Sequence, residues 1–194
     1  FKNVNTRRDE TSGKNGDNYE LYSGFFYDLN LPLLKKGEKF DKIIDPKISF
    51  RYSPNKNKNI TNEERRMDLD NIFTLDRISS NETVEGGESI TFGADYKFIE
   101  NKTLDEVFKI GIAQVFRNQE NKDLPKTSSI GETRSDIFGN LAFYNNNFID
   151  LNYDFSLDNN LNDSKYNNIN LGLSVNKFVT TFEYLDDDIS SDTK

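Results

Sequence analysis

The chain has 194 residues, a formal net charge of −8, and neither Cys nor His. The length fits a single domain, and the negative charge disfavours nucleic acid, whose phosphates attract basic proteins. Without Cys there is no disulfide or thiolate site, and without His the commonest general base and metal ligand is missing. The mean hydropathy of −0.79 is that of a soluble or partly disordered chain. However, 16 Phe and 9 Tyr are too many aromatic residues for disorder.

Apolar and polar residues alternate strictly along several segments. The clearest segment is F-I-D-L-N-Y-D-F-S-L-D-N, which begins at Phe148. Neighbouring side chains of a strand point to opposite faces, so one face of this strand is apolar and aromatic and the other is polar and mostly acidic. No apolar run approaches the roughly 20 residues of a transmembrane helix. The pattern therefore predicts strands of a transmembrane β-barrel, with lipid outside and a wet lumen inside.

About eight such strands are predicted, and residues 1–18, which lack periodicity, are expected to form a loop. The long connections, of about 36, 17 and 8 residues, alternate with short ones, as in outer-membrane barrels with short periplasmic turns. The predicted fold class is an all-β, antiparallel transmembrane β-barrel sector of about eight up-and-down strands. In chain order the strands are Tyr19–Leu33, Ile43–Tyr52, Ser89–Ile99, Glu106–Arg117, Asp136–Tyr144, Phe148–Asn159, Asn167–Val175 and Phe178–Leu185.

Both ends of the chain look cut. It begins at Phe1 rather than Met, and it ends in a polar stretch instead of the aromatic-ended strand that usually finishes such barrels. We therefore expect residues 1–194 to be an internal part of one outer-membrane β-barrel domain. Within it, residues 53–88 are expected to be a long extracellular loop.

Charged residues recur on the polar face of the predicted strands. Strands two to four carry basic residues there, and strands six and eight carry acidic ones. The inner wall is thus expected to hold a basic strip beside an acidic one, the alternative being scattered solubilising charge. Basic groups would suit the phosphates of a lipid headgroup or an acidic plug surface. The candidate lumen-facing charges are Lys47, Arg51, Lys97, Lys109, Arg117, Asp150, Asp154, Asp158 and Glu183.

The long loop divides into two parts by composition. Residues 55–62 are almost all polar, whereas residues 67–79 are too apolar to remain in water. We expect the second part to fold back on the barrel mouth, to bury Phe73 and Leu75, and to act as a lid or merely to stabilise the rim. Arg77 is expected to pair with Asp76, Glu82 or Glu85, in an exposed ion pair worth only about 0–1 kcal/mol. The candidate lid residues are Phe73, Leu75, Arg77 and Glu85.

Several short motifs stand in a fixed order within the stretch from about Leu29 to Phe98. They are Arg51-Tyr52-Ser53-Pro54, Asn71-Ile72-Phe73, Arg77, Glu85-Gly86-Gly87 and Phe92-Gly93. In their order and spacing they resemble the C-terminal barrel domain of the LptD family, the lipopolysaccharide-assembly (organic solvent tolerance) proteins. The chain departs at Ser80-Asn81-Glu82-Thr83, where that family more often has Gly-x-Asp-Arg. An ion pair made by that Arg in the family is therefore not expected in this chain.

The resemblance implies a very large barrel that transports lipopolysaccharide into the outer leaflet of the Gram-negative outer membrane. It also implies a periplasmic jelly-roll domain before this stretch and a lateral gate between the first and last strands, both outside the chain. The implied partners are lipopolysaccharide, the lipid bilayer and a plug lipoprotein of the LptE type. It implies no enzyme activity and no cofactor.

Catalytic and metal sites are not expected from the residues themselves either. No acid/base pair or nucleophile motif is recognisable. Asp150, Asp154 and Asp158 share one face, but successive members lie roughly 13 Å apart along a strand, too far for one metal ion.

Two other interpretations stay open from sequence alone. The chain could belong to a porin or a receptor-type transporter barrel, in which case the motif block is accidental. It could also be a soluble β-sandwich binding module, although such a domain has no reason to gather its long loops at one end. Partition into detergent micelles would separate the sandwich from both barrels.

Overall fold

The computed structural model describes residues 2–7, 17–81, 83–145 and 148–188. Within these ranges a short 3₁₀ turn lies at Thr127–Ser129, and no helix there is long and apolar enough to cross a membrane. The strands are β1 (Lys2–Arg7), β2 (Asp17–Tyr22), β3 (Phe25–Asn30), β4 (Leu33–Lys35), β5 (Phe40–Ser53), β6 (Gly87–Glu100), β7 (Glu106–Arg117), β8 (Arg134–Asn145), β9 (Ile149–Leu157), β10 (Ser164–Val175) and β11 (Phe178–Asp187).

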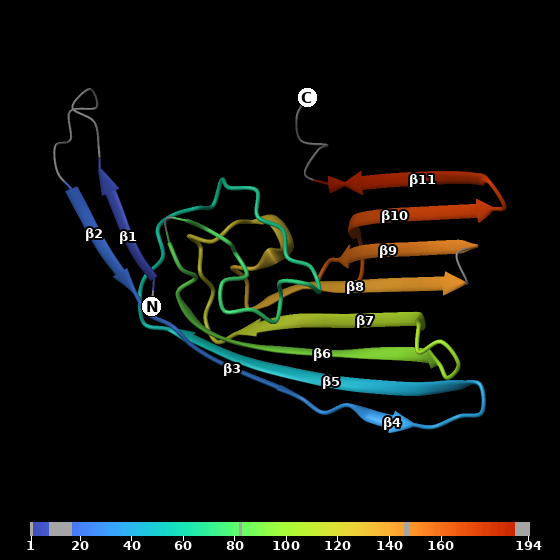
Figure 1. Ribbon diagram of the computed structural model, residues 1–194. Coiled ribbons are helices and arrows are strands. Elements are labelled where there is room, and N and C mark those ends of the chain that lie inside the picture. The colour runs from blue at the N-terminus through green and yellow to red at the C-terminus, as the bar shows by residue number, and fades with distance from the viewer. Residues whose placement is uncertain (1, 8–16, 82, 146–147, 189–194) are drawn as a thin grey trace.

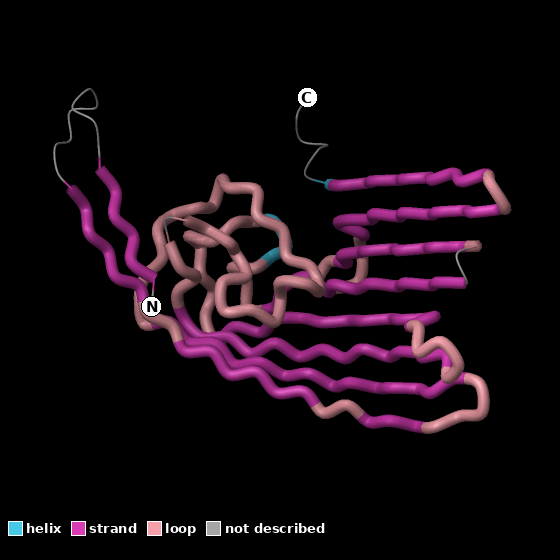
Figure 2. Tube along the Cα trace, in the orientation of Figure 1, coloured by secondary structure: helices cyan, strands magenta, loops and turns pink. Residues whose placement is uncertain are grey.

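One curved antiparallel sheet contains β3 to β11 in chain order (Figures 1 and 2). β3 and β4 both pair with β5, so they are two pieces of one strand. The interruption falls at Pro32, which has no backbone N–H to donate to the ladder. Counted this way, the sheet has eight up-and-down strands and is not closed on itself. The predicted fold class, an all-β sector of a transmembrane barrel, is confirmed.

The beginning of the chain differs from the prediction. Residues 2–7, expected in a loop, form β1, which pairs with β2 from Lys2↔Tyr22 to Arg7↔Asp17. The expected first strand, Tyr19–Leu33, is also divided, because the strand conformation is interrupted at Ser23 and Gly24 between β2 and β3. The prediction missed β1 because this strand lacks alternating apolar residues. Its pairing with β2 depends on backbone groups, which a hydropathy pattern does not report.

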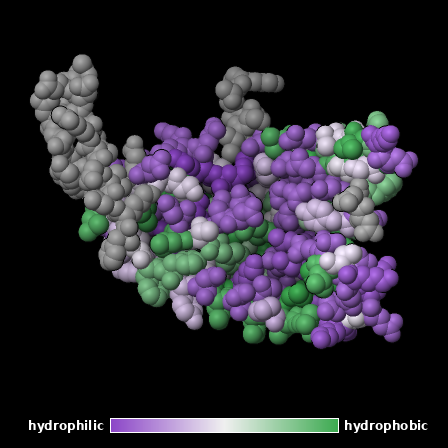
Figure 3. Space-filling model, viewed as in Figure 1, coloured by the Kyte–Doolittle hydropathy of each residue, from purple (hydrophilic) through white to green (hydrophobic). Residues whose placement is uncertain are grey.

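Burial along the strands is inverted relative to a soluble sheet. On β5, Phe50 and Tyr52 are 37% and 44% exposed, whereas Ser49 and Arg51, which alternate with them, are 3% and 2% exposed. We call the apolar, exposed side the outer face and the polar side the inner face. In the view of Figure 3, hydrophilic residues cover much of the surface and many hydrophobic ones lie along its lower margin. A continuous aromatic surface is not left to water by a soluble protein, and it suits contact with lipid.

The connections differ in length at the two ends of the sheet. Residues 54–86, here the inner loop, and residues 118–133, here the second loop, lie together over one end (Figure 1). At the opposite end, the turns that join β4 to β5, β6 to β7 and β10 to β11 are short by comparison. The inner loop lies on the polar inner face, where it covers β5, β6 and β7.

Candidate functional site

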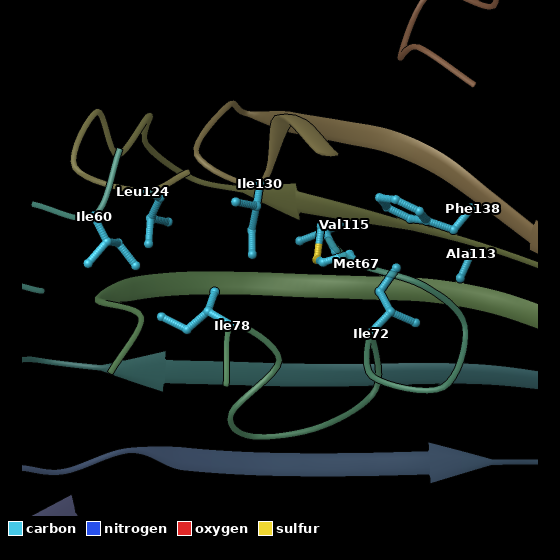
Figure 4. Packing of buried hydrophobic residues seen from close by; sticks show 9 residues of the cluster. All are labelled: Ile60, Met67, Ile72, Ile78, Ala113, Val115, Leu124, Ile130 and Phe138. Atoms are coloured by element: carbon cyan, nitrogen blue, oxygen red, sulfur yellow. The ribbon is translucent and has the colours of Figure 1, made fainter. Parts of the chain in front are cut away.

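An apolar cluster holds the inner loop on the sheet. Met67, Ile72 and Ile78 of this loop are buried against Ala113 and Val115 of β7 (Figure 4). Burying a side chain of this size contributes about 1.5–3 kcal/mol. Residues 67–79 therefore fold back over the inner wall, as predicted from their composition. The other buried members are Ile60, Leu124, Ile130 and Phe138, so the second loop and β8 share the cluster.

Two glycines of the inner wall provide hollows for the loop. A Cβ on Gly93 would lie 2.7 Å from Cζ of Phe73, and a Cβ on Gly111 would lie 2.8 Å from Cδ1 of Leu69. A side chain at either position would therefore require Phe73 or Leu69 to shift. Phe73 and Leu69 are partly buried in these hollows. The expected burial of Leu75 is wrong, because its side chain is 38% exposed.

Glu85, at the end of the inner loop, is fully buried among three arginines. Arg77 binds it with both ends of its guanidinium, Nε to Oε2 at 2.8 Å and Nη2 to Oε1 at 2.6 Å. Arg117 of β7 donates Nη1 to Oε1 of Glu85, and Arg51 of β5 holds Nη1 at 3.5 Å from the same oxygen. Ser89 and Thr91 of β6 accept further hydrogen bonds from Arg77. We call these four charged residues the Glu85 cluster.

The cluster also binds backbone carbonyls of the inner loop. Nε of Arg51 donates to the carbonyl of Leu75 at 2.9 Å, and its Nη2 donates to the carbonyl of Glu85. Nη2 of Arg117 donates to the carbonyl of Gly86 at 2.5 Å. Arg51 of β5 and Arg117 of β7 therefore bind carbonyls at both ends of the segment from Leu75 to Gly86. The exposed Arg77 ion pair expected from the sequence is therefore wrong, because the pair with Glu85 is buried. With the arginines of β5 and β7 it attaches the loop more strongly than an exposed pair would.

The neighbouring arginines keep the buried Glu85 carboxyl ionised. Burial alone would raise the pKa of this carboxyl, but the charges of Arg77, Arg51 and Arg117 and the hydrogen bonds from Arg77 outweigh burial and lower its pKa from 4.5 to about 2. A shift of this size corresponds to roughly 3 kcal/mol of stabilisation for the charged form. Removing one partner of such a buried pair leaves an uncompensated charge, which costs about 3–5 kcal/mol.

The residues of the motif block come together in space. Arg51, Arg77 and Glu85 meet in the cluster, and Phe73 lies over Gly93. Motifs far apart in the sequence thus form one attachment between the inner loop and the wall.

The basic candidate residues outside the Glu85 cluster lie on the inner face, and two of them form ion pairs with acidic residues there. Nζ of Lys47 is 2.7 Å from Oδ2 of Asp95, and Nζ of Lys97 is 3.3 Å from Oε2 of Glu106. Asp95 and Glu106 were not among the sequence candidates, and they interleave negative charge with the basic residues of β5 to β7. Whether a strip of charge acts on a ligand stays a prediction.

Three of the four acidic candidates lie on the inner face of the sheet, and the fourth follows the end of a strand. Asp154 of β9 accepts a hydrogen bond at 2.6 Å from Nδ2 of Asn140. Asp150, by strand alternation, and Glu183, paired with Asn170, lie on the same face as Asp154. Asp158 differs, because it follows the end of β9 and accepts from the backbone N–H of Asn162 at 2.7 Å.

A cavity of about 370 Å³ lies between the inner loop and the wall. Arg66 of the loop stacks on the ring of Tyr166, with Cζ 4.0 Å from the ring centre, and places Nη2 2.5 Å from Oδ1 of Asp187 in β11. The inner loop therefore reaches from β5 and β6 across to the last described strand. Lys109 and Asp154 line the same cavity.

Sequence reasoning missed several of these residues. Arg66, Tyr166 and Asp187 come from three separate segments, and only the fold brings them together. In the described ranges, no group of three or more Asp, Glu, His or Cys residues is placed to hold a metal ion. The polar side chains of the inner wall are held instead by ion pairs and hydrogen bonds to one another and to the inner loop.

An antiparallel sheet with an aromatic outer face and a polar inner face that holds its own loops defines this chain as part of a membrane β-barrel wall. Over residues 2–193 the sequence matches the family described as LptD, LPS transport system D, and the chain belongs to this family. No curated protein matches the chain. The family transports lipopolysaccharide at the outer membrane of Gram-negative bacteria and is not an enzyme family. The predicted family and location are confirmed.

Proposed function

We propose that this chain is a section of the wall of a β-barrel translocon that assembles lipopolysaccharide into the outer leaflet. The observation that carries the proposal is the family match over residues 2–193 on a sheet with one apolar and one polar face. Acyl chains of the lipid require the bilayer side, and its sugars require the wet side. A wall with these two faces separates those environments.

We further propose that the inner loop and the second loop lie at the extracellular end. Long loops face outward in outer-membrane barrels and short turns face the periplasm, and the two loops gather at one end of this sheet (Figure 1). A plug lipoprotein of the LptE type would then contact the part of the inner face that the loops leave accessible, on β9, β10 and β11. The half-buried polar residue Asn170 of β10 lies on that surface.

Replacement in cells tests the transport proposal. The complete protein that contains this chain should restore lipopolysaccharide at the surface of a Gram-negative cell depleted of its own LptD-family protein. Surface lipopolysaccharide, measured by labelling intact cells, is the readout. A barrel that assembles normally but restores none, and instead lets small solutes through as a porin does, would reject the proposal.

A further inference from the structure

The Glu85 cluster contains more positive charge than its one carboxylate can balance. Arg51, Arg77 and Arg117 are each at most 6% exposed, and Glu85 is 0% exposed. Arginine stays protonated in proteins, so the three guanidinium groups and one carboxylate leave an excess of two positive charges. Asp76 of the inner loop also attracts Arg51, but it is exposed to solvent. Buried charge without a counter-charge is costly, so the cluster favours an added anion.

Two donor groups of the cluster lack a hydrogen-bond acceptor within the described residues. They are Nη1 of Arg51 and Nε of Arg117, and both are buried. Nη1 of Arg51 lies 3.5 Å from Oε1 of Glu85, which is longer than a good hydrogen bond. Buried polar groups in proteins almost always have partners. Unused N–H groups on arginines are donors suited to an oxyanion.

A groove leads to one of these arginines. It has a volume of about 550 Å³ and lies between residues 52–57 and 117–123, with Arg117, Gly86 and Gly87 in its lining. A Cβ on Gly87 would lie 3.0 Å from Nη2 of Arg117, and the φ of this residue is +87°, so glycine keeps the space beside the guanidinium open. Arg117 therefore belongs both to the buried cluster and to the groove.

The exposed charges of the groove nearly cancel. Its basic side chains besides Arg117 are Lys56 and Lys122, and its acidic ones are Glu88, Glu120 and Asp123. All five are exposed and screened by water. The unbalanced charge of the buried cluster then dominates the potential beside Arg117. Its sign favours an anion that enters the groove.

We propose that the groove between residues 52–57 and 117–123 binds a phosphate-type oxyanion through Arg117. The ligand chemistry is a phosphate group, either free in solution or carried on a lipopolysaccharide. Only the second source depends on the proposed transport function. An anion bound here would join the inner loop, the second loop and β7, so its binding would stabilise the closed arrangement of the two loops.

Thermal unfolding of the full-length protein in detergent, titrated with inorganic phosphate at constant ionic strength, tests the free-phosphate source. The unfolding temperature is expected to rise and saturate. In Arg117→Lys, which keeps the charge but loses the Nε donor, the apparent affinity is expected to fall by about tenfold or more. Arg134→Gln, an exposed charge at the start of β8, should leave the phosphate response unchanged.

Binding of lipopolysaccharide before and after enzymatic removal of its phosphates tests the other source. Weaker binding caused by both dephosphorylation and Arg117→Lys, without a response to inorganic phosphate, assigns the site to the lipid. If Arg117→Lys changes neither phosphate nor lipopolysaccharide binding, the proposal is overturned.

A double variant guards against misfolding of Arg117→Lys. Lys56→Gln with Lys122→Gln changes only exposed residues of the groove. It leaves the acidic Glu88, Glu120 and Asp123 without exposed basic neighbours in the groove, so it is expected to weaken phosphate binding severalfold. An unchanged affinity in this folded double variant would remove the site from the groove. A phosphate response in a protein that does not transport lipopolysaccharide would reject the proposed function and leave this site intact.

Discussion

Arg77 binds Glu85 through two parallel hydrogen bonds, at 2.8 Å and 2.6 Å, with both side chains almost fully buried. The two residues belong to the same loop, eight positions apart in the sequence. Their pair alone would only shape the loop. Because Arg51 of β5 and Arg117 of β7 contact the same carboxylate, the pair also fixes the loop to the barrel wall. One carboxylate thus connects the loop with two strands.

Glu85→Gln is expected to destabilise the assembled protein by about 3–5 kcal/mol, because three buried arginines lose the buried carboxylate that they share. The midpoint of denaturant-induced unfolding in detergent measures the effect. Glu88→Gln is the matched control, since this carboxylate is exposed and accepts a hydrogen bond from Asn118. Equal stability of the two variants would show that the cluster contributes no net attachment.

Acid should weaken the same attachment. The folded pKa of Glu85, about 2, lies below its ordinary value of 4.5. A lowered pKa means that stabilisation is complete above pH 4.5 and is lost as the pH falls from about 4.5 towards about 2. We expect a loss of roughly 3 kcal/mol across that interval, and a smaller loss in Glu85→Gln. Parallel stability curves for the two proteins between these pH values would contradict the assignment.

Alternation predicted most of the sheet, because lipid on one side and water on the other impose a period of two that local sequence carries. The composition of residues 67–79 also predicted that they fold back on the barrel mouth, since Ile72 and its apolar neighbours need burial. It could not place Leu75 in water, because its loop position depends on a turn that hydropathy does not encode. The Glu85 cluster was out of reach for another reason. Its residues Arg51 and Arg117 are 66 positions apart in the sequence, and only the strand register brings them to one carboxylate.

The assignment of the faces predicts different effects for neighbouring residues of β10. Leu171 pairs with Phe182 and Leu151 on the outer face, whereas Asn170 pairs with Glu183 and Asn152 on the inner face. An arginine facing lipid near the midplane costs about 2–4 kcal/mol. Leu171→Arg should therefore reduce the amount of assembled barrel far more than Asn170→Arg at nearly the same depth. Heat-modifiable mobility on a gel reports assembly, and similar losses in both variants would contradict the faces.

The ion pair between Arg66 and Asp187 should contribute much less than the Glu85 cluster. Its side chains are 22% and 25% exposed, and partly solvated pairs are worth about 0–1 kcal/mol. Stacking of Arg66 on Tyr166 adds a further contribution of about 0.5–1 kcal/mol. Arg66→Gln should thus cost no more than about 2 kcal/mol of unfolding free energy. A double-mutant cycle with Asp187→Asn isolates the pair, and a coupling as large as that of Arg77 with Glu85 would refute this ranking.

If the inner loop acts as a lid on the lumen, loosening it should make the outer membrane leaky. Ile72→Asp places a charge at a side chain that is 1% exposed, in the centre of the apolar cluster, and should release residues 67–79 from the wall. Leu75→Asp introduces the same charge three residues away on the exposed side of the same loop and should leave the loop in place. Both variants keep the Glu85 cluster. Entry of an antibiotic normally excluded by the outer membrane is expected with Ile72→Asp alone. Normal exclusion by an Ile72→Asp barrel that assembles fully would mean that the packing serves the stability of the rim and does not close the lumen.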